Sequence, residues 1–156
     1  MEQKKNNINI YYKNRQWSSA FLVQKLINLY IKNGKKNQAN KIVFKALQKI
    51  NLKTKKDSFL ILTKAIFNLK NSFELKKIKK GAVVFEIPFP IKNKKKQIFK
   101  ALHLLVRASK IKEKNLSDSL ADSIIEASQK KGVCFQNKVD FLKKVHSNRV
   151  YLHWRW

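Results

Sequence analysis

The residues of this sequence that could do chemistry are almost all lysines. Thirty-six lysines and arginines stand against nine acidic residues, which gives a net charge of +27 at pH 7. Lysine is a compact, hydrated charge that suits phosphate oxygens, whereas arginine, which occurs here only four times, is the usual bidentate reader of base edges. Because a free chain with this charge would repel itself, the composition predicts a polyanionic partner. Nucleic acid is favoured over an anionic membrane surface.

Side chains that could support catalysis are few and lie far apart in the sequence. The histidines stand at positions 103, 146 and 153, and the single cysteine, Cys134, has no partner for a disulfide and no neighbouring base. No glycine pair could form a phosphate-cradling loop. Since nucleophilic, metal-binding and acid–base constellations are all missing, we predict that the chain is not an enzyme and uses no cofactor.

Helices are the main elements that must position the lysines. Apolar residues recur with the helical period at about 18–31, 39–50 and 57–67, and Asp57 or Ser58 can cap the third of these segments. Three more helices are expected at about 93–110, 117–130 and 136–150. Glycines 34, 81 and 132 follow or separate these runs, where a positive φ is useful.

From residue 72 the apolar period changes from helical to alternating, which predicts a β-hairpin at about 72–91 with Gly81 in its turn. Pro88 and Pro90 lie in one register of the return strand, as suits an unpaired edge. Because a two-stranded ribbon is marginal alone, it should lean on another part of the molecule. The predicted fold class is mainly α, with about six helices in one bundle-like domain and a β-hairpin arm inserted between the third and fourth helices.

Lysines are concentrated on this arm and on the helix that follows it. On the helix, Lys96, Lys100, His103, Arg107 and Lys110 fall on one stripe, and no acidic residue occurs from 87 to 112. A solvated helix face is the ordinary explanation of a charge run, but such faces mix signs to limit repulsion. The stripe is therefore predicted to face phosphate.

For two other segments, the sequence allows more than one contact partner. Asp118, Asp122 and Glu126 form an acidic line at i, i+4 and i+8, which should point away from nucleic acid, toward solvent or a basic neighbour. At the other segment, Trp154 and Trp156 flank Arg155. These tryptophans could stack on exposed bases or dock onto the helical core. Trp17, before the first helix, is expected to belong to the core or to a hydrophobic staple and not to stack on a base.

Four segments in order resemble one family, the seventh protein of the small ribosomal subunit. An apolar helix leads into the turn Asn33-Gly34-Lys35-Lys36, and the hairpin from Phe73 to Ile91 is similar to the family's basic β-arm. The segment from Leu120 to Gly132 looks like its fifth helix, and the ending His153-Trp154-Arg155-Trp156 resembles its His-Tyr-Arg-Trp ending. The resemblance covers about residues 17–156. The sequence departs from the family at Gly81-Ala82, where the family has paired glycines.

The resemblance implies a structural constituent of the small ribosomal subunit that binds the 3′ major domain of small-subunit rRNA. It would organise the subunit head near the tRNA exit site, beside neighbouring head and platform proteins and exit-site tRNA and mRNA. The residues predicted to contact RNA, from the resemblance and from charge placement together, are Lys35, Lys36, Lys76, Lys77, Lys79, Lys80, Lys92, Lys94, Lys95, Lys96, Lys100, Arg107, Lys110, Arg149, Arg155 and Trp156.

The expected organisation is a basic N-terminal extension at 1–16 followed by a single helical rRNA-binding domain at 17–156. Abundant lysine and asparagine, with no targeting segment and no membrane span, favour a ribosome of the mitochondrial matrix, with a plastid or the bacterial cytoplasm as alternatives. A general basic nucleic-acid-binding protein without a ribosomal role is the alternative function. A basic protein of the membrane surface is disfavoured, because a flat membrane would not need a hairpin with a basic tip.

Overall fold

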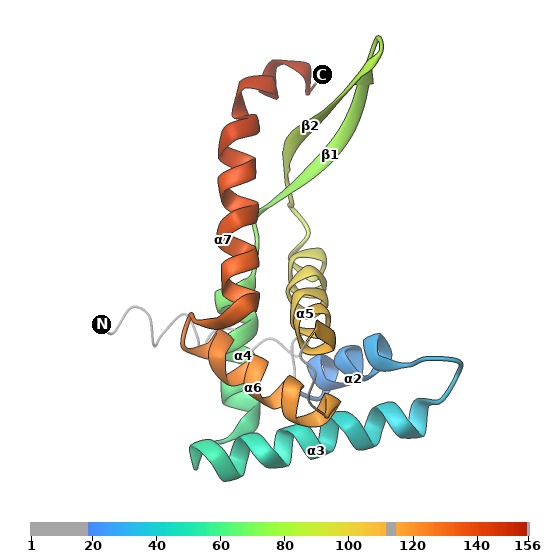
Figure 1. Cartoon of the computed structure of the whole chain (residues 1–156), viewed down its shortest axis with the longest axis vertical. Coiled ribbons are helices and arrows are strands. Elements are labelled where there is room, and N and C mark those ends of the chain that lie inside the picture. Colours follow the sequence, from blue (N-terminus) through green and yellow to red (C-terminus); the bar gives the residue numbers. More distant parts are fainter. Residues whose placement is uncertain (1–18, 112–114, 156) are drawn as a thin grey trace.

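A computed structural model describes residues 19–111 and 115–155 of the chain, and the predicted extension at 1–16, Trp17 and Trp156 lie outside them. The predicted fold class is confirmed, because the two described ranges hold six α-helices, and a β-hairpin that projects from the helical body follows the third of them (Figure 1). In chain order the elements are α2 (Ser19–Tyr30), α3 (Lys36–Thr54), α4 (Ser58–Leu69), β1 (Phe73–Lys80), β2 (Val83–Pro90), α5 (Lys94–Ile111), α6 (Leu116–Ser128), α7 (Gly132–Ser147) and the 3-10 helix η2 (Asn148–Trp154).

Helix α6 is the centre of the helical body, packed against α3, α4, α5 and α7. Its inward side alternates large residues with small ones, and Leu120, Ala121, Ile124 and Ala127 are fully buried. Small residues let neighbouring helices approach closely, while Leu120 and Ile124 fill the space between them. No helix in the two described ranges is both long enough and apolar enough to cross a membrane.

Local chemistry sets the corners between these helices. The Asp57 side chain accepts a hydrogen bond from the Phe59 N–H at 3.0 Å, which confirms the predicted cap of α4. The corner between α6 and α7 requires glycine at 132, where φ is +81° and an added Cβ would lie 2.8 Å from the Glu126 Cβ. The predicted start of the last helix at 136 is wrong, because this tight corner lets α7 begin at Gly132 itself.

Strands β1 and β2 form an antiparallel hairpin in which Phe73 pairs with Pro90 and Lys80 with Val83. Gly81 has a φ of +61° and Ala82 does not have a positive φ, a pattern typical of a type II′ turn. The Ile91 N–H donates to the Ser72 carbonyl at 2.8 Å, so the alternation of the ladder places both strand prolines at positions that need no N–H.

The hairpin leans on the end of the chain, as its marginal size predicted. The Phe85 ring lies 5.0 Å from the Tyr151 ring and 4.4 Å from the Trp154 ring, and the Arg155 guanidinium donates to the Pro88 carbonyl at 2.6 Å. Figure 1 shows the end of the chain beside the upper half of the hairpin. Trp154 therefore docks onto the arm and not onto the helical core. The predicted continuous helix to 150 is also wrong, because α7 ends at Ser147 and tightens into η2 to reach the hairpin.

Candidate nucleic-acid interface

The first group of predicted contacts lies in the turn between α2 and α3. Asn33 and Gly34 both have positive φ values, +50° and +71°, so the chain reverses within a few residues. Lys35 and Lys36 follow this reversal and are exposed. Figure 1 shows the turn at the edge of the helical body, away from α7. These two lysines are thus presented at a projecting corner.

The lysines of β1 point in two directions, because successive side chains of a strand alternate between its faces. On one face, the Lys76 ammonium lies 4.6 Å from the Phe89 ring centroid and the Lys80 ammonium lies 4.9 Å from the Trp154 ring centroid. Lys77 and Lys79 belong to the opposite face and are exposed. All four positive charges remain accessible, but only Lys77 and Lys79 lie on the face that does not carry the tail.

The prediction that the basic stripe on α5 has no acidic partner is wrong for its first two lysines. The ammonium groups of Lys96 and Lys100 lie 2.7 and 2.8 Å from the Glu74 carboxylate, which belongs to β1. Their hydrogen bonds lower the pKa of Glu74 from its ordinary value of 4.5 to about 2. The sequence has no acidic residue from 87 to 112, but the partner of these lysines, Glu74, comes from the strand that precedes this segment. These pairs tie the base of the arm to α5.

The rest of the α5 stripe is exposed, as contact with phosphate would require. His103, Arg107 and Lys110 are exposed, and so are Lys92, Lys94 and Lys95 at the helix entry. The Asn93 side chain accepts a hydrogen bond from the Lys95 N–H at 2.9 Å and so fixes the start of the helix. The entry to α5 therefore places a dense group of ammonium charges directly beneath the arm.

The acidic line of α6 faces a basic neighbour within the chain. The Lys49 ammonium lies 2.5 Å from the Asp118 carboxylate, and the Lys53 ammonium lies 2.6 Å from that of Asp122. The hydrogen bond to Asp122 raises the pKa of Lys53. The predicted basic neighbour is correct, and it is helix α3. The charges of these two α3 lysines are consequently neutralised by acidic side chains of the same chain.

The two predicted arginines at the end of the chain differ in their surroundings. Arg149 is exposed on η2, whereas Arg155 is partly buried and contacts the hairpin through Pro88 and the Phe89 ring. In the described residues no group of three or more histidine, cysteine or acidic side chains could hold a metal ion. The positive charge of the arm and of the α5 entry is the chemistry that the described surface offers.

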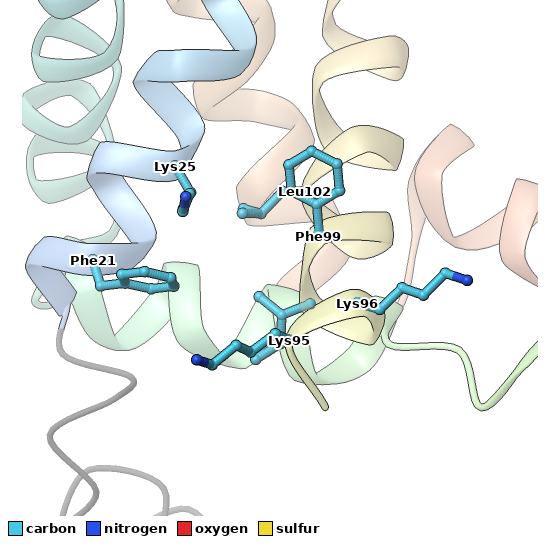
Figure 2. Close-up of a pocket in the computed structure, with 7 residues that line it drawn as sticks. Phe21, Lys25, Lys95, Lys96, Phe99 and Leu102 are labelled. Carbon is cyan, nitrogen blue, oxygen red and sulfur yellow. The ribbon is translucent and has the colours of Figure 1, made fainter. Parts of the chain in front are cut away.

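The surface also has a groove that was not predicted from the sequence. Between α2 and α5 lies a groove of about 360 Å³ (Figure 2). Phe99 faces it from the lysine-rich side of α5, and an aromatic residue placed outside the apolar stripe of a helix was the sequence feature that could have revealed it. The lining residues are Phe21, Lys25, Lys95, Lys96, Ile98, Phe99 and Leu102.

Comparison with known proteins agrees with the predicted resemblance. The family model described as "Ribosomal protein S7p/S5e" matches residues 1–149. It therefore includes the segment predicted as an N-terminal extension and leaves out residues 150–156.

Three similar proteins are all called small ribosomal subunit protein uS7. The one from Pelagibacter ubique (strain HTCC1062) is 34% identical over 139 residues, 88% of each chain. That from Tropheryma whipplei (strain Twist) is 31% identical over 138 residues, 88% of each chain, and that from Metamycoplasma arthritidis (strain 158L3-1) is 32% identical over 136 residues, 86% of each chain. The chain belongs to the ribosomal protein S7p/S5e family.

Proposed function

We propose that this chain is a structural constituent of the small ribosomal subunit, that it binds the 3′ major domain of small-subunit rRNA, and that it is not an enzyme. Its relatives carry the name of a small-subunit ribosomal protein, and the family model spans nearly the whole chain. In this role it organises the subunit head near the tRNA exit site during translation. Head and platform proteins are its neighbours, and exit-site tRNA and mRNA pass close to the arm.

The observation that carries the RNA-binding part is the uneven use of charge. Acidic side chains on α6 pair with Lys49 and Lys53 at 2.5 and 2.6 Å. Among the described residues, no carboxylate lies closer than 3.9 Å to the lysines of the α2–α3 turn, to those of the arm, or to Lys92, Lys94 and Lys95 at the α5 entry, and all of these lysines are exposed. A lysine that is already paired within the chain has little to offer a phosphate, whereas an exposed one displaces counterions from RNA. The RNA-facing surface therefore runs from the α5 entry up the arm, with the α2–α3 turn as a separate contact.

The shape of the arm suits RNA that lies above the helical body. Its base is fixed to α5 through Glu74, and its upper half is fixed to the end of the chain through Phe85 and Trp154. A hairpin held at both places loses less conformational freedom on binding than a free ribbon would. Lys77 and Lys79 on its open face then neutralise phosphates of one rRNA segment.

The compartment is a separate part of the proposal. The sequence is rich in lysine and asparagine and poor in arginine, a bias that favours a mitochondrial ribosome, although the similar proteins named above are bacterial. A plastid and a bacterial cytoplasm are the two alternative compartments. The sequence of the bound rRNA distinguishes the three.

The test is crosslinking of the protein in its native cell extract, followed by sequencing of the attached RNA and mapping of the attached peptides. We expect one region in the 3′ domain of small-subunit rRNA, attached to peptides from 76–96. The same reads identify the genome that encodes the rRNA. Recovery of scattered RNA, DNA or lipid would instead leave a general basic nucleic-acid-binding protein and would refute the ribosomal proposal.

A further inference from the structure

The groove between α2 and α5 has an apolar interior and a charged rim. Ile98 and Leu102 are buried and line it, while Phe21 and Phe99 form walls on opposite sides. Figure 2 shows Phe21 and Lys25 on α2 facing Phe99 and Leu102 on α5 across the opening. Its volume of about 360 Å³ lies within the range of sites for small ligands, roughly 300–1,000 Å³. The groove is thus large enough for one flat, mostly apolar group.

Phe99 is held as an open wall of this groove. Its side chain is 44% exposed, although it lies among lysines on a helix whose apolar side is buried elsewhere. The His103 ring meets it edge to face, with centroids 4.7 Å apart, and so restricts its orientation. A fixed, exposed aromatic face is what a nucleic-acid base stacks on.

The rim carries the charge that a nucleotide requires. The Lys25 ammonium lies 5.4 Å from the Phe21 ring centroid, and Lys95 is exposed at the first turn of α5. Among the described residues no acidic side chain lies within 4.0 Å of either ammonium, whereas Lys96 turns to Glu74. Figure 2 shows Lys96 extending away from the groove. Two ammonium groups therefore border an aromatic cavity, and no carboxylate in the described part of the chain is paired with either of them.

We propose that this groove binds one unstacked base of rRNA, with the base against Phe99 and the flanking phosphates on Lys25 and Lys95. The inference rests on the proposed function and deepens it, because it assigns an aromatic contact where the arm provides only phosphate contacts. Sequence-tolerant stacking on an aromatic side chain needs no hydrogen-bond readout, in keeping with the scarcity of arginine. The charge of the rim selects a nucleotide over an apolar peptide side chain.

The test compares three variants of the full chain in binding to a transcript of the 3′ domain of small-subunit rRNA, measured over a series of salt concentrations. In Phe99→Ala the ring is lost, in Phe99→Tyr it is kept, and Phe44→Ala removes a similarly exposed phenyl ring from α3, outside the groove. We expect Phe99→Ala to bind about 5- to 150-fold more weakly, because a stacked base is worth roughly 1–3 kcal/mol. Phe99→Tyr and Phe44→Ala should bind like the unchanged chain.

The salt dependence separates stacking from charge. Phe99→Ala should leave the slope of log affinity against log salt unchanged, whereas Lys25→Gln should reduce it by roughly 0.7–0.9 for one lost phosphate contact. Photo-crosslinking of transcripts that contain 5-bromouridine should attach RNA to a peptide with Phe21 or Phe99. Circular dichroism of each variant checks that the helical body is intact.

Failure of this site can be told apart from failure of the proposed function. If the unchanged chain does not bind the 3′-domain transcript, the proposed function is refuted and the site with it. If the unchanged chain binds and Phe99→Ala matches Phe44→Ala, the groove is not a base site although the function stands. A concentration-dependent dimer that Phe99→Ala abolishes, with RNA affinity unchanged, would assign the groove to a second copy of the chain.

Discussion

The junction of α3 with α6 and the β-hairpin arm use the same residue type in opposite ways. At the junction, Lys49 and Lys53 lie within 2.6 Å of the carboxylates of Asp118 and Asp122. On the arm, Lys77 is 74% exposed and lies 3.9 Å from the nearest carboxylate, that of Glu86, while the neighbouring lysine on the same face, Lys79, has no acid within 4.0 Å among the described residues. The lysines of the junction are neutralised by carboxylates of the same chain, whereas the two lysines of the arm keep their charge available to a partner.

This difference shows that the number of lysines does not give the number of RNA contacts. A count along the sequence treats every ammonium group alike, whereas the fold removes some of them by bringing a distant acid close. Lys96 and Lys100 stand between the two extremes, because these two positive charges share the single carboxylate of Glu74, whereas Lys49 and Lys53 have one carboxylate each. Variants that neutralise matched pairs of lysines in each region can therefore test whether the two regions have different roles.

The largest expected effect concerns the body that holds both regions. Leu47 on α3 is 5% exposed and belongs to the core. We expect Leu47→Ala to lower the free energy of unfolding by about 2–5 kcal/mol, because it leaves a cavity in the core. Denaturant titration followed by circular dichroism measures the loss. A loss below about 1 kcal/mol, small for a buried leucine, would mean that α3 is not packed against the core as described.

The next effect is on RNA binding and concerns the arm. We expect the double variant Lys77→Gln/Lys79→Gln to reduce the slope of log affinity against log salt by roughly 1.4–1.8, since each lost phosphate contact removes roughly 0.7–0.9. Neither lysine packs on the tail, so the unfolding free energy should stay unchanged. Filter binding to the 3′-domain transcript over a salt series gives the slope. An unchanged slope would remove the open face of the arm from the RNA-binding surface.

A smaller effect concerns the base of the arm and depends on pH. The pKa of Glu74 is about 2 in the folded chain and 4.5 ordinarily, so the unfolded chain binds more protons between these values. The stabilisation is complete above about pH 4.5 and is lost as the pH falls toward 2. After allowance for solvent screening we expect about 1 kcal/mol.

Glu74→Gln isolates this contribution. The variant should be less stable than the unchanged chain at pH 6, and the difference should shrink as the pH falls toward 2, where Glu74 takes up its proton in the folded chain as well. Thermal unfolding at a series of pH values provides the measurement. If the difference between the two proteins does not depend on pH, the ion pairs with Lys96 and Lys100 do not stabilise the base of the arm.

The smallest effect on RNA binding is expected at the junction, and it completes the comparison. Lys49→Gln/Lys53→Gln removes the same charge as the arm double variant, but it should leave the salt slope of RNA binding unchanged. Exposed ion pairs contribute roughly 0.2–1 kcal/mol each, so the stability should fall by about 1 kcal/mol. The two double variants are measured side by side in the same assays. Equal salt slopes would show that the internal pairing does not decide which lysines bind RNA.

A structural feature could be predicted from the sequence when the residues that determine it lie within one helix or strand, and not when they lie on different ones. The period of apolar residues locates the helices and the hairpin because it is read within one element, and the Asp57 cap depends on a hydrogen bond only two residues along. The start of α7 could not be predicted from its own pattern. It depends on the close approach of Gly132 to Glu126 on another helix.

The candidate site divides in the same way. Exposure of Lys35, Lys77 and Arg107 follows from local pattern, and the structure presents them as predicted. The pairing of Lys100 with Glu74 spans 26 residues, and the contact of Arg155 with Pro88 spans 67, so no local pattern contains them. The groove also needs two helices that are far apart in the chain. Local composition gives the available charges, and long-range contacts decide which of them stay available.

The contact between Phe85 and Trp154 sets an order of events during synthesis. Because a chain is made from its N-terminus, strand β2 leaves the ribosome about 70 residues before the aromatic side chains that cover it. In the interval the hairpin is a marginal ribbon with exposed apolar side chains, and its lysines protect it by repelling other copies. We expect nascent chains arrested after residue 147 to be cleaved by protease in the arm. Those that have released residues 148–156 should resist, so the arm is the last part of the described fold to become rigid.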